Sequence, residues 1–238
     1  MTGIVEVFIE SNVKHSPSVQ CRIDPLGRVE AISTHEQVLG GSTGQVYEGC
    51  TFPANVDYRR DLQDAGLRVG EELAALGALG RFSVDFVSVP TESGWDHHAL
   101  EINLRKGGTT LPSLVLQFLT DGSYDLDTGT YRSALGSELC YYASDNVQSD
   151  HYRGLLPEDV IDIIVCDGLH FDQARQLGTV FHIIGAVSEY GKLGMVSIAS
   201  TPEGARSLHD RTISSLDRAA VPLWESPVPA SRTQRRLP

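Results

Sequence analysis

The sequence predicts an α+β protein in which helices flank a mostly antiparallel sheet. Segments with strand-like periodicity are interleaved with segments of helical periodicity along the 238 residues. Many strand pairs are separated by short runs of turn-forming residues, which join antiparallel strands, whereas parallel neighbours need a long crossover. No internal repeat is present. These observations favour α+β over a parallel doubly wound sheet.

The first strands are expected near the start of the chain. Residues 3–10 predict a mostly apolar strand. Residues 19–23 and 29–33 predict two more strands, and residues 24–27, Asp-Pro-Leu-Gly, are a strong turn signal between them. Residues 38–44 contain Leu-Gly-Gly-Ser-Thr-Gly, and we expect a flexible glycine-rich loop there.

A helix is predicted over residues 58–76. Asn55 or Asp57 can cap its start, and Gly77 can end it. Its apolar residues recur at steps of three and four, as in an amphipathic helix: Leu62, Ala65, Val69, Leu73 and Leu76.

Residues 80–87 and 99–104 predict two strands, because apolar and polar residues alternate in both. The segment between them, residues 90–98, is rich in turn formers and is expected to be a loop. An antiparallel hairpin follows from this order. Such a hairpin can bring Asp85 of the first strand beside Glu101 of the second, on the polar face.

The second strand carries a row of chemically useful groups. Glu101, Asn103 and Arg105 share one face, with about 7 Å between alternate residues. Residues 107–110, Gly-Gly-Thr-Thr, then form a turn whose backbone N–H groups can face an anion. Two buried carboxylates side by side repel unless a cation lies between them, and Mg²⁺ is held by one or two carboxylates plus substrate phosphates. The stretch predicts a nucleotide–magnesium site; the alternative is an ordinary half-buried hairpin whose polar face meets water.

The rest of the chain predicts helices and strands in alternation. Residues 121–129 superficially resemble a calcium loop but lack the glutamate at the twelfth position, so we expect a surface turn. The other expected elements are a short helix over 114–119, a strand over 140–142, a helix over 157–164, a hairpin of 179–185 with 194–199, and a final helix capped by Thr201 with Pro202 at its first position.

The composition limits the classes of partner. A net charge of −12 and a pI of about 5.0 argue against a nucleic-acid surface, because phosphate contacts need clustered Lys and Arg. No apolar run approaches the roughly 20 residues of a membrane helix, and the N-terminus does not read as a signal peptide. Four scattered cysteines fit buried thiols in a reduced, cytoplasmic protein better than a zinc site.

Several familiar motifs are absent. The sequence has no Gly-x-x-x-x-Gly-Lys-Ser/Thr loop, no Gly-x-Gly-x-x-Gly after a strand and no Gly-x-Ser-x-Gly elbow. Asp96, His97 and His98 suggest a metal site, but consecutive side chains cannot all converge from a regular strand, so we expect a loop-tip histidine pair. His182 lies in a predicted strand between apolar residues and is expected to be structural.

The hairpin resembles a known family. Phe-Ser-Val-Asp-Phe-Val, a hairpin and Glu-Ile-Asn-Leu-Arg-Lys-Gly-Gly-Thr-Thr are similar to the C-terminal, metal-binding half of the ATP-grasp superfamily. The nearest resemblance is to peptide-ligase-like members related to the pheganomycin peptide ligase. It spans residues 3–215, and Glu-x-Asn-x-Arg is its most specific part. We expect one ATP-grasp C-terminal domain over residues 1–220 and, from the Pro, Ser and Arg content, a disordered basic tail over 221–238.

The resemblance implies roles for individual residues. Asp85, Glu101 and Asn103 would hold Mg²⁺, and Arg105 would contact the transferred phosphate or acyl-phosphate. Glu6, on the strand that would form the hinge behind the adenine, would contact the adenine or ribose, with Glu10 as the alternative. The turn residues Gly107, Gly108 and Thr109 would contribute to ATP binding. Polar residues on the phosphate or substrate side would include His35 and Gln37.

The implied activity is ATP-dependent carboxylate–amine (peptide) ligation through an acyl-phosphate, with ATP and Mg²⁺ as cofactors and amino acids or peptides as substrates. In the family an upstream lobe supplies phosphate-binding lysines, and none of Lys14, Lys106 and Lys192 precedes the hinge strand. We therefore expect an incomplete ligase. The alternatives are a non-catalytic remnant or a binding module that pairs with a second copy or with a partner carrying the other lobe. A metal-dependent phosphohydrolase using the same acids also stays open.

Overall fold

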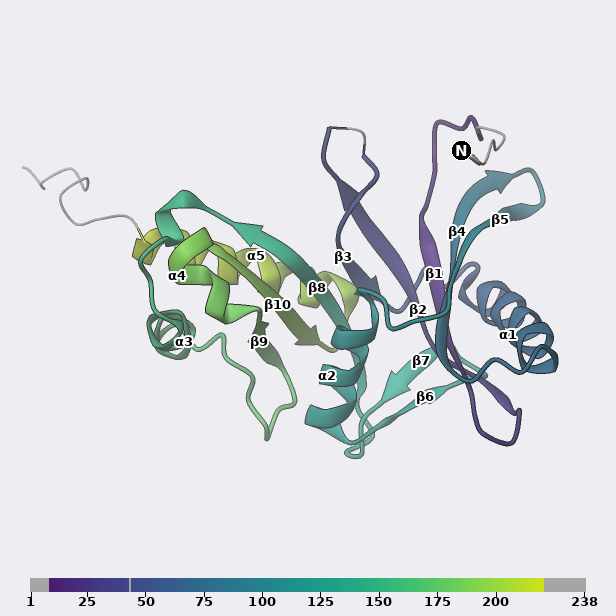
Figure 1. Cartoon of the computed structure of the whole chain (residues 1–238). Coiled ribbons are helices and arrows are strands. Elements are labelled where there is room, and N and C mark those ends of the chain that lie inside the picture. Colours follow the sequence, from purple (N-terminus) through teal and green to yellow (C-terminus); the bar gives the residue numbers. More distant parts are fainter. Residues whose placement is uncertain (1–8, 43, 221–238) are drawn as a thin grey trace, which may run out of the picture.

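The computed structural model describes residues 9–42 and 44–220, and its strands form one long curved sheet (Figure 1). Its strand order is β5-β4-β1-β2-β3-β8-β10-β9, and all neighbours along this path are antiparallel. Their bounds are β1 Pro17–Ile23, β2 Val29–Gly40, β3 Val46–Phe52, β4 Gly80–Thr91, β5 Gly94–Asn103, β8 Glu138–Gln148, β9 Gly178–His182 and β10 Lys192–Ala199. Two short strands, β6 Ser123–Asp125 and β7 Thr130–Arg132, branch from β8. The predicted α+β class is confirmed.

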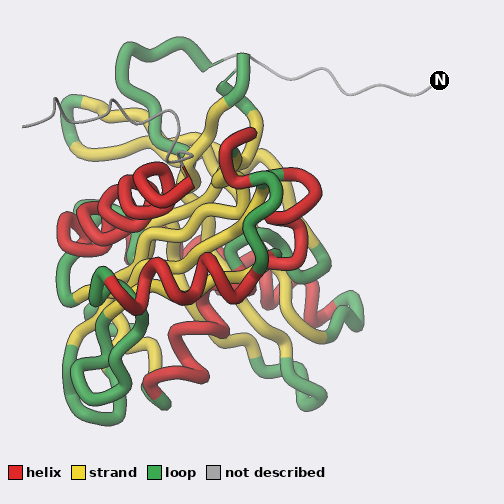
Figure 2. Tube along the Cα trace, turned by 90° about the vertical axis from the view of Figure 1, so that its left-hand side faces the viewer, coloured by secondary structure: helices red, strands yellow, loops and turns green. Residues whose placement is uncertain are grey.

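Helices lie against both faces of this sheet (Figure 2). They are α1 Arg59–Ala75, α2 Thr110–Thr120, α3 Pro157–Cys166, α4 Val187–Tyr190 and α5 Pro202–Ala220, with single 3₁₀ turns at Asp150–Tyr152 and Ile184–Ala186. No helix of the described ranges is long and apolar enough to cross a membrane. The predicted strand over 3–10, except its last two residues, and the predicted tail over 221–238 lie outside the described residues.

The two faces of the sheet have different chemistry. Side chains alternate along a strand, so Val19 and Val84 point to the face covered by α1, which we call the back face. Gly66 of α1 lies against Val19 there, and a methyl group at position 66 would come within 2.6 Å of it. The opposite, front face carries polar residues in the same strands, including Gln20 and Asp85. Toward β8 and β10, α2 covers the front face and α5 the back face.

The local predictions for α1 are mostly confirmed. The helix lies within the predicted range, and Gly77 follows it with φ of +83°. The expected side-chain cap is wrong. Tyr58 is the N-cap residue and makes no capping hydrogen bond, while the Asn55 side chain accepts a hydrogen bond from the Asp57 backbone N–H. The chain therefore turns into the helix through an Asx turn rather than a side-chain cap.

Two predicted loops are shorter in the structure. Residues 90–98 are not a loop, because β4 continues to Thr91 and β5 begins at Gly94. Trp95 packs edge-on against Tyr58 at 4.8 Å between ring centroids, and this distant contact holds the extended hairpin. The predicted glycine-rich loop over 38–44 begins as the end of β2, and the strand that follows it, β3, was not predicted.

The remaining elements follow the sequence closely. Thr201 caps α5, because its Oγ1 accepts a hydrogen bond from the Gly204 N–H at 3.0 Å. The β9 and β10 strands pair as predicted, but α4 lies in their connection, so they do not form a tight hairpin. The first turn of α2 begins four residues before the predicted start at 114.

Candidate functional site

The β4–β5 hairpin places the two predicted acids side by side on the front face. Asp85 is directly opposite Glu101, and Ser83 is directly opposite Asn103. Residues opposite each other in an antiparallel pair have Cβ atoms about 4.5–5.5 Å apart and point to the same face. The Asn103 Nδ2 donates a hydrogen bond to the Asp85 Oδ2 at 3.1 Å. The predicted adjacency of Asp85, Glu101 and Asn103 is therefore present.

The pKa of the Asp85 carboxyl is shifted by this arrangement. Burial, and secondly the negative charge of Glu101, raise the pKa of the Asp85 carboxyl to about 6. Arg105 and a hydrogen bond from Gln37 act in the opposite direction. A carboxyl whose pKa is raised by a neighbouring acid gains most from a cation between the two.

Two buried carboxylates were expected here, and this expectation is wrong for Glu101. Asp85 is half-buried, but Glu101 is exposed, because β5 is the edge strand of the sheet. The apolar side chains of this edge are open for the same reason: Leu100 and Ile102 of β5 are 49 % and 47 % exposed, and Leu104, directly after β5, is 62 % exposed.

The Gly-Gly-Thr-Thr turn joins β5 to the start of α2. Its Gly107 N–H donates to the Thr110 Oγ1 at 3.1 Å, and that hydroxyl donates to the Gln20 Oε1 at 3.0 Å. Gly108 lies under the Tyr47 ring, where an added methyl group would come within 2.6 Å of the ring. The turn is thus fixed beside the polar face, and a helix N-terminus of this kind favours anions.

These groups surround one cavity of about 370 Å³. Three residues that line it, Leu39, Gln45 and Tyr47, were not predicted from the sequence. They come from the end of β2, from β3 and from the turn between them, and β3 was not predicted. The full lining is Gln37, Leu39, Gln45, Tyr47, Ser83, Asp85, Glu101, Asn103, Arg105, Gly107, Gly108 and Thr109.

Of the residues outside this hairpin that were predicted to contact ATP or the substrate, only some lie at the cavity. Gln37 lines the cavity, but His35 does not, because it is fully buried and hydrogen-bonds the Tyr141 hydroxyl through Nε2 at 2.6 Å. Glu6 lies outside the described residues. Its alternative, Glu10, is exposed and outside any strand.

The donor set at the hairpin fits magnesium. In the described part of the chain, no group of three or more His, Cys, Asp or Glu side chains is placed to share a metal ion. Asp85 and Glu101 are only two carboxylates, with the Asn103 amide beside them. Hard oxygen donors in this small number, completed by water and phosphate, are what Mg²⁺ takes.

Among the described residues, the histidines considered from the sequence are not grouped with enough other ligands to hold a metal ion. His97 and His98 lie within β5 rather than at a loop tip; His97 Nδ1 hydrogen-bonds the Ser88 Oγ at 2.6 Å, and His98 Nε2 lies 3.3 Å from the Asp96 Oδ2. His182 packs over the Gly194 backbone, and burial lowers its pKa. This environment is compatible with the structural role expected for His182.

Comparison with known proteins decides the family. A family described as IQCH-like ATP-grasp matches residues 1–127, which is more than half of the chain. The chain belongs to the ATP-grasp family. Over 232 residues it is 34 % identical to L-propargylglycine–L-glutamate ligase of Streptantibioticus cattleyicolor, a match that covers 96 % of this chain and 44 % of that protein. The chain therefore spans less than half the length of this curated relative.

Solved structures share the fold of this ATP-grasp chain at low identity. The ATPase subunit of phosphoribosylaminoimidazole carboxylase from Aquifex aeolicus is 14 % identical with a TM-score of 0.52, covering 89 % of this chain and 58 % of that one. A biotin carboxylase from Campylobacter jejuni is 12 % identical with a TM-score of 0.51, covering 86 % of this chain and 49 % of that one. The family resemblance in the sequence is thus confirmed.

A second family model matches the C-terminal part of the chain. Residues 159–212 match a family described as the PGM1 C-terminal domain.

Proposed function

We propose that this chain supplies the magnesium- and phosphate-binding half of an ATP-dependent carboxylate–amine ligase. The observation that carries the proposal is the facing pair of Asp85 and Glu101, beside Asn103, in a cavity that also holds Arg105 and the turn before α2. The curated relative is named as a ligase that joins two amino acids, L-propargylglycine and L-glutamate. We accordingly propose amino acids or peptides as the carboxylate and amine substrates. From the four scattered cysteines we propose the cytoplasm as the compartment.

The residues divide the chemistry between them. Asp85, Glu101 and the Asn103 amide oxygen would hold Mg²⁺, after the amide flips so that its oxygen replaces the Nδ2 that now donates to Asp85. When bound, the ion neutralises charge on the ATP phosphate oxygens. Arg105 reaches the same cavity and would pair with the transferred phosphoryl group.

The proposed reaction then has two steps. A substrate carboxylate oxygen attacks the γ-phosphorus of ATP, which forms an acyl-phosphate and releases ADP. An amine attacks the acyl carbon, and inorganic phosphate leaves while the amine loses a proton. Gly107, Gly108 and Thr109 line the cavity at the start of α2. The Gly107 N–H already donates to Thr110, so the N–H groups of Gly108 and Thr109 would stabilise the phosphate oxygens during both steps.

Isothermal titration with Mg²⁺ and a non-hydrolysable ATP analogue tests the proposal. We expect the chain to bind with a Kd of roughly 0.1–1 mM, equivalent to about 4–5.5 kcal/mol. Glu101→Gln should abolish this binding, whereas Glu92→Gln, at the exposed tip of the same hairpin, should leave it unchanged. In a protein that contains both lobes, Glu101→Gln should abolish turnover while the fold is retained. Equal binding by the two variants would refute the assignment.

A second candidate is a non-catalytic module that pairs with a partner carrying the other lobe, or with a second copy. The observation that favours it is the exposed row of Leu100, Ile102 and Leu104 on the edge strand. Clustered apolar side chains of this kind often mark contact surfaces. No Mg-ATP binding in a folded chain, together with a partner that protects these three residues from solvent, would favour this candidate over a competent half-site.

A further inference from the structure

A second cavity lies on the back face, behind the β2–β3 wall of the candidate site. It measures about 480 Å³ and is bounded by β2, β3, β8, the 3₁₀ turn after β8, and α5. Its lining includes Val38 and Glu48, whereas Gln37, Leu39 and Tyr47 line the front cavity. The two cavities therefore use alternate residues of the same strands and are separate sites.

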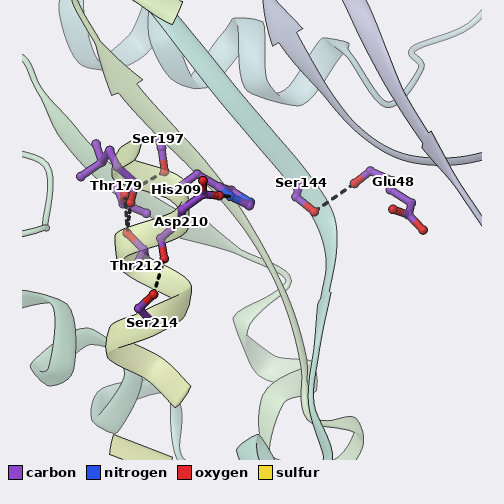
Figure 3. Close-up of polar contacts among 9 residues, drawn as sticks. Glu48, Ser144, Thr179, Ser197, His209, Asp210, Thr212 and Ser214 are labelled. Atoms are coloured by element: carbon purple, nitrogen blue, oxygen red, sulfur yellow. Dashed lines mark hydrogen bonds and ion pairs between the residues drawn. The ribbon is translucent and has the colours of Figure 1, made fainter. Parts of the chain in front are cut away.

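Glu48 lines this back cavity and lies at a β-bulge. Val38 pairs with Gly49 and Leu39 pairs with Tyr47, so Glu48 is the extra residue between two regular pairs. Bulges commonly redirect one side chain relative to the strand. The Glu48 backbone carbonyl accepts a hydrogen bond from the Ser144 Oγ at 3.0 Å, which fixes the bulge against β8 (Figure 3).

His209 is a buried polar group on the opposite wall. Its side chain extends from α5 toward the strand that carries Ser144 (Figure 3), and its ring lies 4.3 Å from the Tyr142 ring. The residue is only 7 % exposed, and its Nε2 has no hydrogen-bond partner among the described residues. Burial lowers its pKa, which favours the neutral ring. Because Nδ1 lies 3.2 Å from the Asp210 Oδ1 and donates to it, Nε2 is left as an acceptor.

The charged side chains that line the cavity are acidic, while the Arg206 guanidinium lies outside the lining, 5.4 Å from the centroid of the Tyr142 ring. Glu48 and Asp217 contribute carboxylates, and none of the lining residues is Lys or Arg. Asp217 accepts a hydrogen bond from the Tyr152 hydroxyl at 2.5 Å, which holds it in place. The cavity thus offers two carboxylates and one imidazole acceptor beside the apolar side chains of Val38 and Ile213.

We propose that this back cavity binds a protonated primary amine carried on a short aliphatic chain. An ammonium group has three donors and no acceptor, so it complements a wall that presents carboxylates and an imidazole lone pair. The aliphatic chain would contact Val38 and Ile213. The volume is larger than one ammonium group requires, which suits an amino-alkyl ligand. A free amine and the lysine side chain of a peptide share this chemistry.

Titration with 1,5-diaminopentane at low ionic strength tests the proposal, followed by calorimetry and by amide chemical shifts. We expect saturable binding and shifts confined to the back cavity. Glu48→Gln and His209→Phe should each weaken binding by about tenfold or more, as expected for the loss of a charge-assisted or buried hydrogen bond. The matched control is Glu71→Gln, an exposed acid on α1, which should not change the affinity. A lysine peptide that binds more tightly than 1,5-diaminopentane would indicate a peptide side chain as the ligand, the reverse order a free amine, and the acetyl-lysine peptide should not bind.

Three results would overturn the proposal. One is the absence of saturable binding by the folded wild-type chain in the millimolar range. A second is equal weakening by Glu71→Gln, which would indicate general attraction to a chain of net charge −12. A third is chemical-shift changes centred on Asp85 and Glu101 instead of the back cavity. Because Glu48→Gln should leave Mg-ATP binding intact, this test is independent of the proposed ligase function.

Discussion

Replacing Asp85 by Asn should stabilise the fold at neutral pH. Burial and the charge of Glu101 raise the pKa of Asp85 from 3.8 to about 6. A carboxyl whose pKa is higher in the folded state contributes stability that is complete below about pH 3.8 and is lost as the pH rises through about 6. Above that range the ionised Asp85 carboxylate lowers the free energy of unfolding, and the neutral asparagine removes this unfavourable charge.

The size of the gain follows from the shift. A difference of about two pH units corresponds to roughly 3 kcal/mol as an upper limit, because one unit is about 1.4 kcal/mol. Asp85 is only half-buried, so solvent screens its charge and we expect about 1 kcal/mol. For a chain of this length, that is a rise in Tm of about 2–4 °C.

Thermal unfolding at about pH 7.5 and about pH 4.5 measures this effect. The gain of Asp85→Asn should be present at the higher pH and should fall to roughly a third at the lower one, where folded wild-type Asp85 is largely protonated. Asp64→Asn, at an exposed position on α1, is the matched control and should change the Tm at neither pH. Adding Mg²⁺ at the higher pH should raise the Tm of the wild type but not of Asp85→Asn, because the variant lacks one of the two carboxylates proposed to hold the ion. An equal gain at both pH values would show that the ionised carboxyl is not under electrostatic strain.

Two further predictions concern the core. Burial lowers the pKa of His35 to about 3, so its contribution to stability is complete above pH 6.5 and is lost as the pH falls toward 3, by up to about 1.4 kcal/mol per pH unit. In a plot of the urea unfolding midpoint against pH, His35→Gln should therefore reduce the slope below pH 6.5, and the exposed His151→Gln should not. Equal slopes for the wild type and His35→Gln would contradict this. Gly66→Ala should lower the urea midpoint, because the methyl group would meet Val19 at 2.6 Å. That overpacking costs about 1–3 kcal/mol against a helix-propensity gain of about 1 kcal/mol, and a raised midpoint would refute it.

The sequence by itself predicted the centre of the candidate site. Alternation along β4 and β5 shows which side chains share a face, and a hairpin between adjacent strands leaves few pairing registers. Asp85 and Glu101 could therefore be paired from local pattern alone. The same holds for α1, whose apolar period is strong, and for Thr201 as the cap of α5. These features depend on neighbours close in the chain.

Only the tertiary structure decided the rest of the site. Glu101 is exposed because β5 lies at the edge of the sheet, and strand order is set by pairings between distant segments. Tyr47 and Glu48 line opposite cavities because neighbours in a strand point to opposite faces, but the strand that contains them was not predicted, nor was its bulge at Glu48. That strand contains Gly49, where a methyl group would lie 2.1 Å from the Ala143 carbonyl oxygen of β8. Alternation along one strand specifies faces, but burial, strand order and the walls of a cavity depend on which remote segments pack together, and a local pattern carries no information about them.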